Sequence, residues 1–146
     1  MLQQTQVSTV LKYYRQFLKT FPSIKKLARA DLQDVLKKWE GMGYYARARN
    51  LHQAAKMVVK NYNGNVPNTW EVFRSLPGVG DYIAAAVLSI AFNQAYPVVD
   101  GNVKRVLARL YKIGAPVNQA RSTPVFKEAA GKLLDPKQPG IFNQAM

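Results

Sequence analysis

Apolar residues recur every three or four positions along most of the chain, which is the spacing of a helix that buries one face. This pattern predicts helices over residues 4–21, over a short stretch ending at Leu27, over a third stretch that begins after Asp31, and over residues 45–62. The expected inward face of the first helix consists of Val7, Val10, Leu11, Tyr14, Phe17, Leu18 and Phe21. The expected inward face of the fourth consists of Ala48, Leu51, Ala55, Val58 and Tyr62, and His52 is expected on the helix surface.

The second half of the chain continues the helical pattern. Further helices are predicted from a capping box at 68–71 to residue 75, over residues 81–92, from residue 100 to about residue 112, over residues 123–134, and from residue 142 onward. Residues that can cap a helix N-terminus stand at several of the expected starts, namely Ser23, Asp31, Asp100 and Thr123. Because no convincing alternation of apolar and polar residues indicates a strand, one all-α domain over residues 1–146 is predicted.

The 146 residues include 21 Lys and Arg against 8 Asp and Glu, a net charge of +13, with one histidine and no cysteine. Without cysteine these residues cannot form a disulfide framework, a thiolate metal site, an iron–sulfur cluster or a cysteine nucleophile. No apolar run is long enough for a membrane span or a signal peptide. A folded domain this basic predicts a polyanionic partner, and nucleic acid is favoured over an anionic membrane surface or a ribosomal environment.

The segment Leu76-Pro77-Gly78-Val79-Gly80 separates two predicted helices. A Gly-apolar-Gly hairpin lets the backbone approach a phosphate closely, and the following helix offers free N–H groups and the positive end of its dipole. Pro77, Gly78, Val79 and Gly80 are therefore predicted to form a sequence-independent clamp on a nucleic-acid backbone. The alternative is a tight connection between two helices that binds no ligand.

Asp100 stands alone as an acidic residue between Asp81 and Glu128, and Lys104, Arg105 and Arg109 follow it. One interpretation is that Asp100 caps the helix that begins there. The other is that a carboxylate among phosphate-binding cations stabilises positive charge developing on a deoxyribose. Composition does not decide between these roles, and both can hold if the cap orients the carboxylate.

Five segments together resemble the adenine DNA glycosylases of the MutY type, which belong to the helix-hairpin-helix glycosylases. They are MLQQTQV at 1–7, GMGYYARARNLHQAA at 41–55, LPGVGDYIAAAVLS at 76–89, VDGNVKRVLAR at 99–109 and FNQAM at 142–146. The resemblance implies an all-α fold, the six-helix barrel core of a helix-hairpin-helix glycosylase. It also implies a monofunctional DNA glycosylase of base-excision repair that flips out and removes adenine mispaired with 8-oxoguanine or guanine.

The resemblance assigns catalytic roles by position. Asp100 matches the family's catalytic aspartate, which stabilises the oxocarbenium-like sugar or assists the nucleophile that captures it, and Asn102 matches a residue that hydrogen-bonds this carboxylate. Tyr82 stands where bifunctional relatives carry a Schiff-base lysine. It is expected beside the aspartate, which implies a glycosylase without lyase activity. Lys104 is expected to contact a DNA phosphate rather than trap an abasic sugar.

The resemblance also assigns DNA contacts near the start of the chain. Gln4 and Thr5 match the region that contacts 8-oxoguanine, Tyr44 matches an aromatic wedge inserted into the base stack, and Leu2 matches a neighbouring apolar contact. Wedges of this kind occupy the space that a flipped base vacates. Without the resemblance, ordinary helix or turn packing would be the preferred interpretation of Leu2, Gln4 and Tyr44.

Two features of the family are expected outside these residues: a general-acid glutamate just before MLQQT, and four cysteines for a 4Fe-4S cluster just after FNQAM. The chain is therefore interpreted as a fragment that binds no cofactor or metal. Its expected partner is double-stranded DNA with adenine opposite 8-oxoguanine or guanine, bound by a monomer at the nucleoid in a bacterial cytoplasm. The alternatives are a non-catalytic helix-hairpin-helix DNA-binding module and a glycosylase/lyase like endonuclease III.

Overall fold

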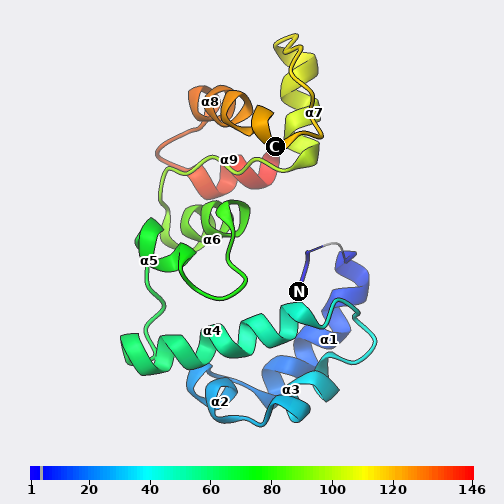
Figure 1. The fold of residues 1–146 in the computed structure, drawn as a ribbon, viewed down its shortest axis with the longest axis vertical. Coiled ribbons are helices and arrows are strands. Elements are labelled where there is room, and N and C mark those ends of the chain that lie inside the picture. The colour runs from blue at the N-terminus through cyan, green and yellow to red at the C-terminus, as the bar shows by residue number, and fades with distance from the viewer. Residues whose placement is uncertain (4) are drawn as a thin grey trace. The chain divides into compact units, whose positions relative to one another are not determined.

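The computed structural model describes residues 1–3 and 5–146, and within these residues all regular secondary structure is helical (Figure 1). The predicted contact residue Gln4 lies outside the described residues. The α-helices are α1 (Val7–Thr20), α2 (Ile24–Arg29), α3 (Leu32–Trp39), α4 (Ala46–Tyr62), α5 (Trp70–Arg74), α6 (Asp81–Phe92), α7 (Gly101–Leu110), α8 (Thr123–Leu133) and α9 (Pro139–Ala145). A short 3-10 turn, η1 (Ala120–Ser122), precedes α8. None of the described helices is long and apolar enough to cross a membrane.

The described residues form two compact units. Unit 1 comprises Met1–Pro67 and Ser75–Gly78, and unit 2 comprises Asn68–Arg74 and Val79–Met146. Each unit has a buried apolar core. In unit 1 the core is made by Val10, Phe17, Phe21, Leu27, Ala28, Val35, Trp39, Met42, Ala48 and Ala55. In unit 2 a cluster of Val103, Leu107, Phe126 and Ala130 joins α7 to α8. The expected single domain over residues 1–146 stays a prediction.

Three of the seven residues expected on the apolar face of the first helix are buried, namely Val10, Phe17 and Phe21. Phe17 packs edge-on against Phe21, with ring centroids 4.9 Å apart, and against Trp39 of α3 at 5.9 Å. The other four residues of this expected face are exposed, namely Val7, Leu11, Tyr14 and Leu18. Seven apolar positions cover a wider arc of a helix than one neighbouring helix can bury, so the unit 1 core takes one stripe of this arc.

Local capping signals position α2 and α3 as predicted. The Ser23 hydroxyl accepts a hydrogen bond from the Lys26 backbone N–H at 3.1 Å, and the Asp31 carboxylate accepts one from Gln33 N–H at 2.7 Å. Each bond satisfies a helical N–H that has no partner within its helix. The predicted caps Ser23 and Asp31 are therefore confirmed.

The buried face of α4 differs from the prediction. Leu51 is 40% exposed, whereas His52 is only 2% exposed and its Nε2 lies 3.1 Å from the Ala30 carbonyl oxygen. The expectation that His52 lies on the surface is wrong, because α2 ends against this side of α4 and its last carbonyl needs a partner. Burial is the main cause that lowers the pKa of His52.

Unit 2 follows the predicted helices closely, with two differences. Helix α6 spans Asp81–Phe92, as predicted. Helix α8 begins at Thr123 with Ser122 as its N-cap, so the prediction that Thr123 caps this helix is wrong by one position. The η1 turn leads directly into α8, which carries Thr123 into the helix and frees its hydroxyl for another partner. The last helix begins at Pro139, earlier than the predicted residue 142.

Candidate active site and nucleic-acid interface

Asp100 caps α7 with one carboxylate oxygen. Its Oδ1 accepts hydrogen bonds from the backbone N–H groups of Asn102 and Val103, both at 2.8 Å. Among the residues that the structure describes, its Oδ2 receives only a long contact of 3.5 Å from the Asn102 side-chain amide, at the limit of hydrogen-bond geometry. The Arg105 guanidinium in turn donates to Asn102 Oδ1. The cap thus fixes the direction of the carboxylate and keeps Oδ2 available, so the two roles considered for Asp100 are compatible.

The segment that leads into Asp100 is held by Asn143 of α9, a residue to which sequence reasoning assigned no role. The Asn143 side-chain amide donates to Tyr96 O and to Ser89 Oγ, both at 2.9 Å, and its Oδ1 accepts from Val98 N–H at 3.0 Å. Because the segment before Asp100 is not helical, these bonds supply partners that its own backbone cannot. The only sequence signal for this role was the motif FNQAM.

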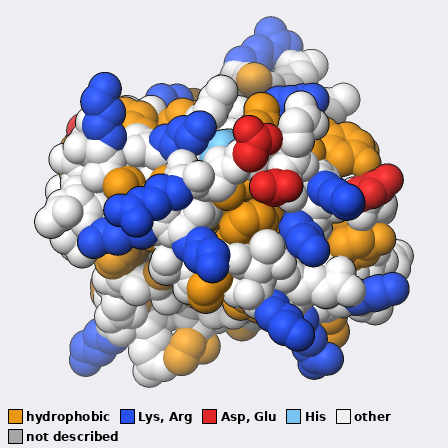
Figure 2. All heavy atoms as spheres, turned by 90° about the horizontal axis from the view of Figure 1, so that it is seen from below, with side chains coloured by type: hydrophobic (Ala, Val, Ile, Leu, Met, Phe, Trp, Pro, Cys, Tyr) orange, Lys and Arg blue, Asp and Glu red, His pale blue; other side chains and the backbone are white. Residues whose placement is uncertain are grey.

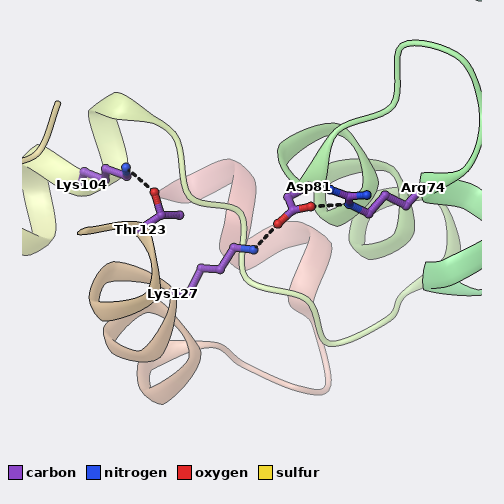
Figure 3. A network of polar contacts seen from close by, with 5 residues as sticks. All are labelled: Arg74, Asp81, Lys104, Thr123 and Lys127. Carbon is purple, nitrogen blue, oxygen red and sulfur yellow. Dashed lines mark hydrogen bonds and ion pairs between the residues drawn. The ribbon is translucent and has the colours of Figure 1, made fainter. Parts of the chain in front are cut away.

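The side chains of Tyr82 and Lys104 lie in different environments within unit 2, the first exposed and the second bonded to another helix. Tyr82 lies in the first turn of α6, is 46% exposed, and makes no hydrogen bond with Asp100 in the part of the chain that the structure describes. The Lys104 Nζ donates to Thr123 Oγ1 at 2.8 Å (Figure 3). It also lies 5.9 Å from the Phe126 ring centroid. The Lys104 ammonium therefore has partners within the protein, and its DNA contact stays a prediction.

The hairpin residues adopt the conformations that their sequence requires. Gly78 has φ +77°, and a Cβ built there would lie 2.6 Å from the Asn50 Cβ of α4, so only glycine fits this turn. Gly80 is the N-cap of α6 and has no side chain to cap it. The first N–H groups of α6 are therefore open to water or to an anion, as the predicted phosphate clamp by Pro77, Gly78, Val79 and Gly80 requires.

An acidic residue at the start of α6 is neutralised by two cations. The Asp81 carboxylate pairs with Arg74 Nε of α5 at 2.5 Å and with Lys127 Nζ of α8 at 2.7 Å (Figure 3). Lys127 and then Arg74 hold the pKa of Asp81 below its usual value, mainly through their hydrogen bonds to it. The carboxylate would repel a phosphate at this helix end, but with its two partners the cluster carries a net positive charge.

In unit 1 the loop before α4 presents Tyr44. Gly41, Gly43 and Tyr44 all have positive φ, and the value for Tyr44 is +48°, which is strained for a residue with a Cβ. Tyr44 is 62% exposed, and Leu2 is 60% exposed. Both therefore display apolar surface, as wedge residues must, although their insertion into DNA stays a prediction.

Arg47 joins the Tyr44 loop to the N-terminal segment, and sequence reasoning missed it. Its guanidinium donates to Met1 O at 2.8 Å, to Thr5 Oγ1 at 3.2 Å and to the Gln3 carbonyl oxygen. These contacts tie Thr5, a predicted 8-oxoguanine contact, to α4. The same guanidinium lies 5.2 Å from the Tyr44 ring centroid. It also donates to carbonyl oxygens of the loop, Met42 O at 3.2 Å and Gly43 O at 3.3 Å.

Comparison with known families decides the classification of the chain. The sequence profile of the HhH-GPD superfamily base excision DNA repair proteins matches residues 1–125. The chain belongs to this superfamily. The Gly78 hairpin and the Asp100 cap are therefore features of a chain whose family is described as base excision DNA repair proteins.

Curated relatives of this HhH-GPD protein are adenine DNA glycosylases. The chain is 47% identical to that of Rattus norvegicus over 146 residues, which is 99% of this chain and 28% of the relative. It is 42% identical to that of Schizosaccharomyces pombe, over 100% of this chain and 32% of the relative. With that of Buchnera aphidicola subsp. Baizongia pistaciae it shares 48% identity over 77% of this chain and 32% of the relative. The chain therefore spans about a third or less of the length of these relatives.

Solved structures confirm the predicted all-α helix-hairpin-helix glycosylase fold. A thermostable thymine-DNA glycosylase matches with a TM-score of 0.86 and 28% identity, over 97% of this HhH-GPD chain and 65% of that chain. A non-covalent endonuclease III–DNA complex matches with a TM-score of 0.80 and 25% identity, over 96% of this chain and 64% of that chain.

Among the residues that the structure describes, no group of three His, Cys, Asp or Glu side chains could hold a metal ion.

Proposed function

We propose that this chain forms the DNA-binding and sugar-stabilising core of a monofunctional adenine DNA glycosylase. The substrate is double-stranded DNA with adenine opposite 8-oxoguanine or guanine. The observation that carries the proposal is Asp100, whose Oδ1 is fixed by two backbone N–H groups while Oδ2 stays available. The names of the relatives and their 42–48% identity support adenine as the base removed.

In this mechanism the hairpin amides grip a phosphate and the exposed side chains of Leu2 and Tyr44 enter the base stack. Binding to phosphates positions the protein without reading sequence. A base within a duplex cannot reach a carboxylate, so adenine is first flipped out, which costs a few kcal/mol of stacking and pairing. The exposed apolar surface of Leu2 and Tyr44 offsets part of this loss by filling the vacated space.

Asp100 then acts on the sugar. As the bond between C1′ and the adenine nitrogen breaks, its electron pair leaves with the base and positive charge develops on the sugar. The free Oδ2 carboxylate oxygen stabilises this charge until a water oxygen bonds to C1′. The proton that this water loses passes through solvent to the departed adenine anion, so that the base ends as neutral adenine. Asp81 does not fit the task of protonating the departing adenine, because Lys127 and Arg74 hold it as a carboxylate.

The test is release of adenine from a duplex that contains adenine opposite 8-oxoguanine, detected as strand breaks after alkali. Asp100→Asn keeps a good N-cap and removes the charge, so we expect the fold to persist and base release to be lost. Asp135→Asn, a matched change at a turn residue of unit 2, is expected to behave like the unmodified chain. Base release that survives Asp100→Asn contradicts the role of Asp100.

A monofunctional reaction is proposed because Tyr82 cannot form a Schiff base and the Lys104 ammonium is bound to Thr123. Borohydride trapping of the chain on abasic DNA separates this proposal from a glycosylase/lyase, which would be trapped efficiently. Salt-sensitive duplex binding without base release would instead favour the non-catalytic DNA-binding module.

The proposal includes no cofactor, since the chain has no cysteine and its residues do not fit an iron–sulfur cluster. It also includes action as a monomer, which sedimentation velocity tests. A bacterial source and a nucleoid location are proposed on the sequence resemblance alone. The named relatives do not discriminate between sources, since they come from mammals and yeast as well as bacteria.

A further inference from the structure

The positive charge of the chain is distributed unevenly between its two units. Unit 1 contains twelve Lys and Arg against three Asp and Glu, a net charge of +9. Unit 2 contains nine Lys and Arg against five Asp and Glu, a net charge of +4. The predicted hairpin clamp and the N-terminal contacts contain no Lys or Arg, so most of the unit 1 charge lies elsewhere.

Much of this charge lines one groove between α2 and α3. The groove has a volume of about 680 Å³ and is lined by five cations, Lys25, Lys26, Arg29, Lys37 and Lys38, with Asp34 as its acidic residue. All five cations are exposed, and none forms an ion pair with any described residue. Figure 2 shows this side of the molecule, where Lys and Arg side chains outnumber Asp and Glu and surround an apolar centre. We call this surface the α2–α3 groove.

The α2–α3 groove and the hairpin glycine lie on opposite sides of α4. Gly78 packs against Asn50, whereas the end of α2 packs against His52 through the Ala30 carbonyl. A step of two positions along an α-helix turns the side-chain direction by about 200°, so Asn50 and His52 face nearly opposite directions. A ligand in the α2–α3 groove therefore does not compete for space with a phosphate beside Gly78.

The shape of the groove favours a phosphate backbone over an acidic protein segment. Protein partners gain most of their affinity from side chains buried in apolar pockets. The aromatic residue that lines the groove, Phe21, is only 6% exposed and already packs on Phe17, so its ring is not open to a side chain of a protein partner. Four of the five cations are lysines, which bind phosphates as point charges without a fixed geometry. A concave surface of one charge sign also focuses the field on a polyanion.

We propose that the α2–α3 groove binds the sugar–phosphate backbone of a second nucleic-acid segment, independently of base sequence. Because the α2–α3 groove and the hairpin glycine lie on opposite sides of α4, one chain can hold two DNA segments together. Such a protein can pass from one duplex to another without first dissociating into solution. The proposal rests on charge and shape alone, and it stands whether or not the chain removes adenine.

The experiment compares two variants of the full chain that have the same net charge. The groove variant combines Lys26→Gln, Arg29→Gln, Lys37→Gln and Lys38→Gln, and keeps Lys25 because its stem packs on Gly64. The control variant removes four exposed cations elsewhere, by Lys12→Gln, Arg15→Gln, Lys60→Gln and Lys137→Gln. Circular dichroism melts verify that both variants fold.

The first measurement is capture of a fluorescent 25-base-pair duplex by beads that carry an unlabelled duplex, with the protein as the bridge. The second is the salt dependence of duplex binding by fluorescence anisotropy. We expect the original chain and the control variant to bridge, and the groove variant to lose bridging. Loss of four phosphate contacts should also make the slope of log K against log salt shallower by roughly 3–4.

Three outcomes overturn the proposal. If the groove variant bridges as well as the original chain, the groove does not bind DNA. If the control variant loses bridging equally, net charge rather than the groove is responsible. If a polyglutamate peptide binds the original chain but not the groove variant while duplex bridging is unchanged, the groove binds an acidic protein segment instead.

Discussion

Arg47 offers the sharpest test of how unit 1 presents its predicted DNA contacts. Its half-buried guanidinium connects the N-terminal segment to the loop that carries Tyr44. Replacement by methionine keeps an unbranched apolar stem, lacks the guanidinium end of the side chain, and removes every hydrogen bond that the guanidinium donates. The partners then lose their donor, and the two segments are no longer joined.

The size of the effect follows from the acceptors that lose a partner. Those in exposed positions, such as the Gln3 carbonyl, can turn to water. The carbonyl oxygens of Met1, Met42 and Gly43 accept from Arg47 in partly buried positions, at 2.8, 3.2 and 3.3 Å. At about 1 kcal/mol for each bond, their loss lowers the free energy of unfolding by about 3 kcal/mol. For a chain of this size that corresponds to a fall in Tm of roughly 6–12 °C.

Thermal unfolding followed by circular dichroism measures this change. The matched control is Arg49→Met, which removes an exposed arginine of the same helix and is expected to change the free energy of unfolding by less than about 0.5 kcal/mol. Duplex affinity provides the functional measurement, and Arg47→Met should weaken it more than Arg49→Met because Leu2 and Tyr44 lose their common support. If Arg47→Met melts within a degree of the original chain, the guanidinium contacts do not hold the two segments together.

Three further predictions follow from the geometry of individual residues. Gly78→Ala should lower the free energy of unfolding by about 2–4 kcal/mol in urea denaturation, because it combines positive φ with a clash against Asn50. Gly80→Ala, where a Cβ meets nothing within 4 Å, should change it by less than about 1 kcal/mol, and equal effects would contradict the clash. Asn143→Leu should destabilise by about 2–3 kcal/mol and slow adenine release, since it removes three hydrogen bonds, two of them to the segment before Asp100 and one to Ser89 of α6, whereas Gln144→Leu removes one. Because the pKa of Asp81 is lowered in the folded chain, its stabilisation is complete above the ordinary carboxyl pKa and disappears as the pH falls through the folded value. Asp81→Asn should therefore lower the Tm slightly at pH 7, and this Tm difference should shrink as the pH is lowered below the ordinary carboxyl pKa. A Tm difference that does not shrink on acidification would exclude this linkage.

The sequence alone determined where most helices begin and end. The bounds of α6, the caps at Ser23 and Asp31, and the cap of α7 by Asp100 all follow from residues within three positions of the helix end. Such signals are local because a capping side chain reaches only the first free N–H groups of its own helix. The hairpin glycine at position 78 was identified for the same reason, since its turn depends on its own backbone angle.

The tertiary structure decided which side of each helix is buried and which side chains support the candidate site. His52 is buried and Leu51 exposed because the end of α2 packs on one side of α4 and supplies a carbonyl there. Arg47 reaches back more than 40 positions to the N-terminal segment, and Asn143 reaches more than 40 positions to the segment before Asp100. Local periodicity contains no information about such partners, because the contacts exist only once distant helices have packed. The sequence therefore determined the helices and Asp100, and only packing decided what holds Asp100 and Tyr44 in position.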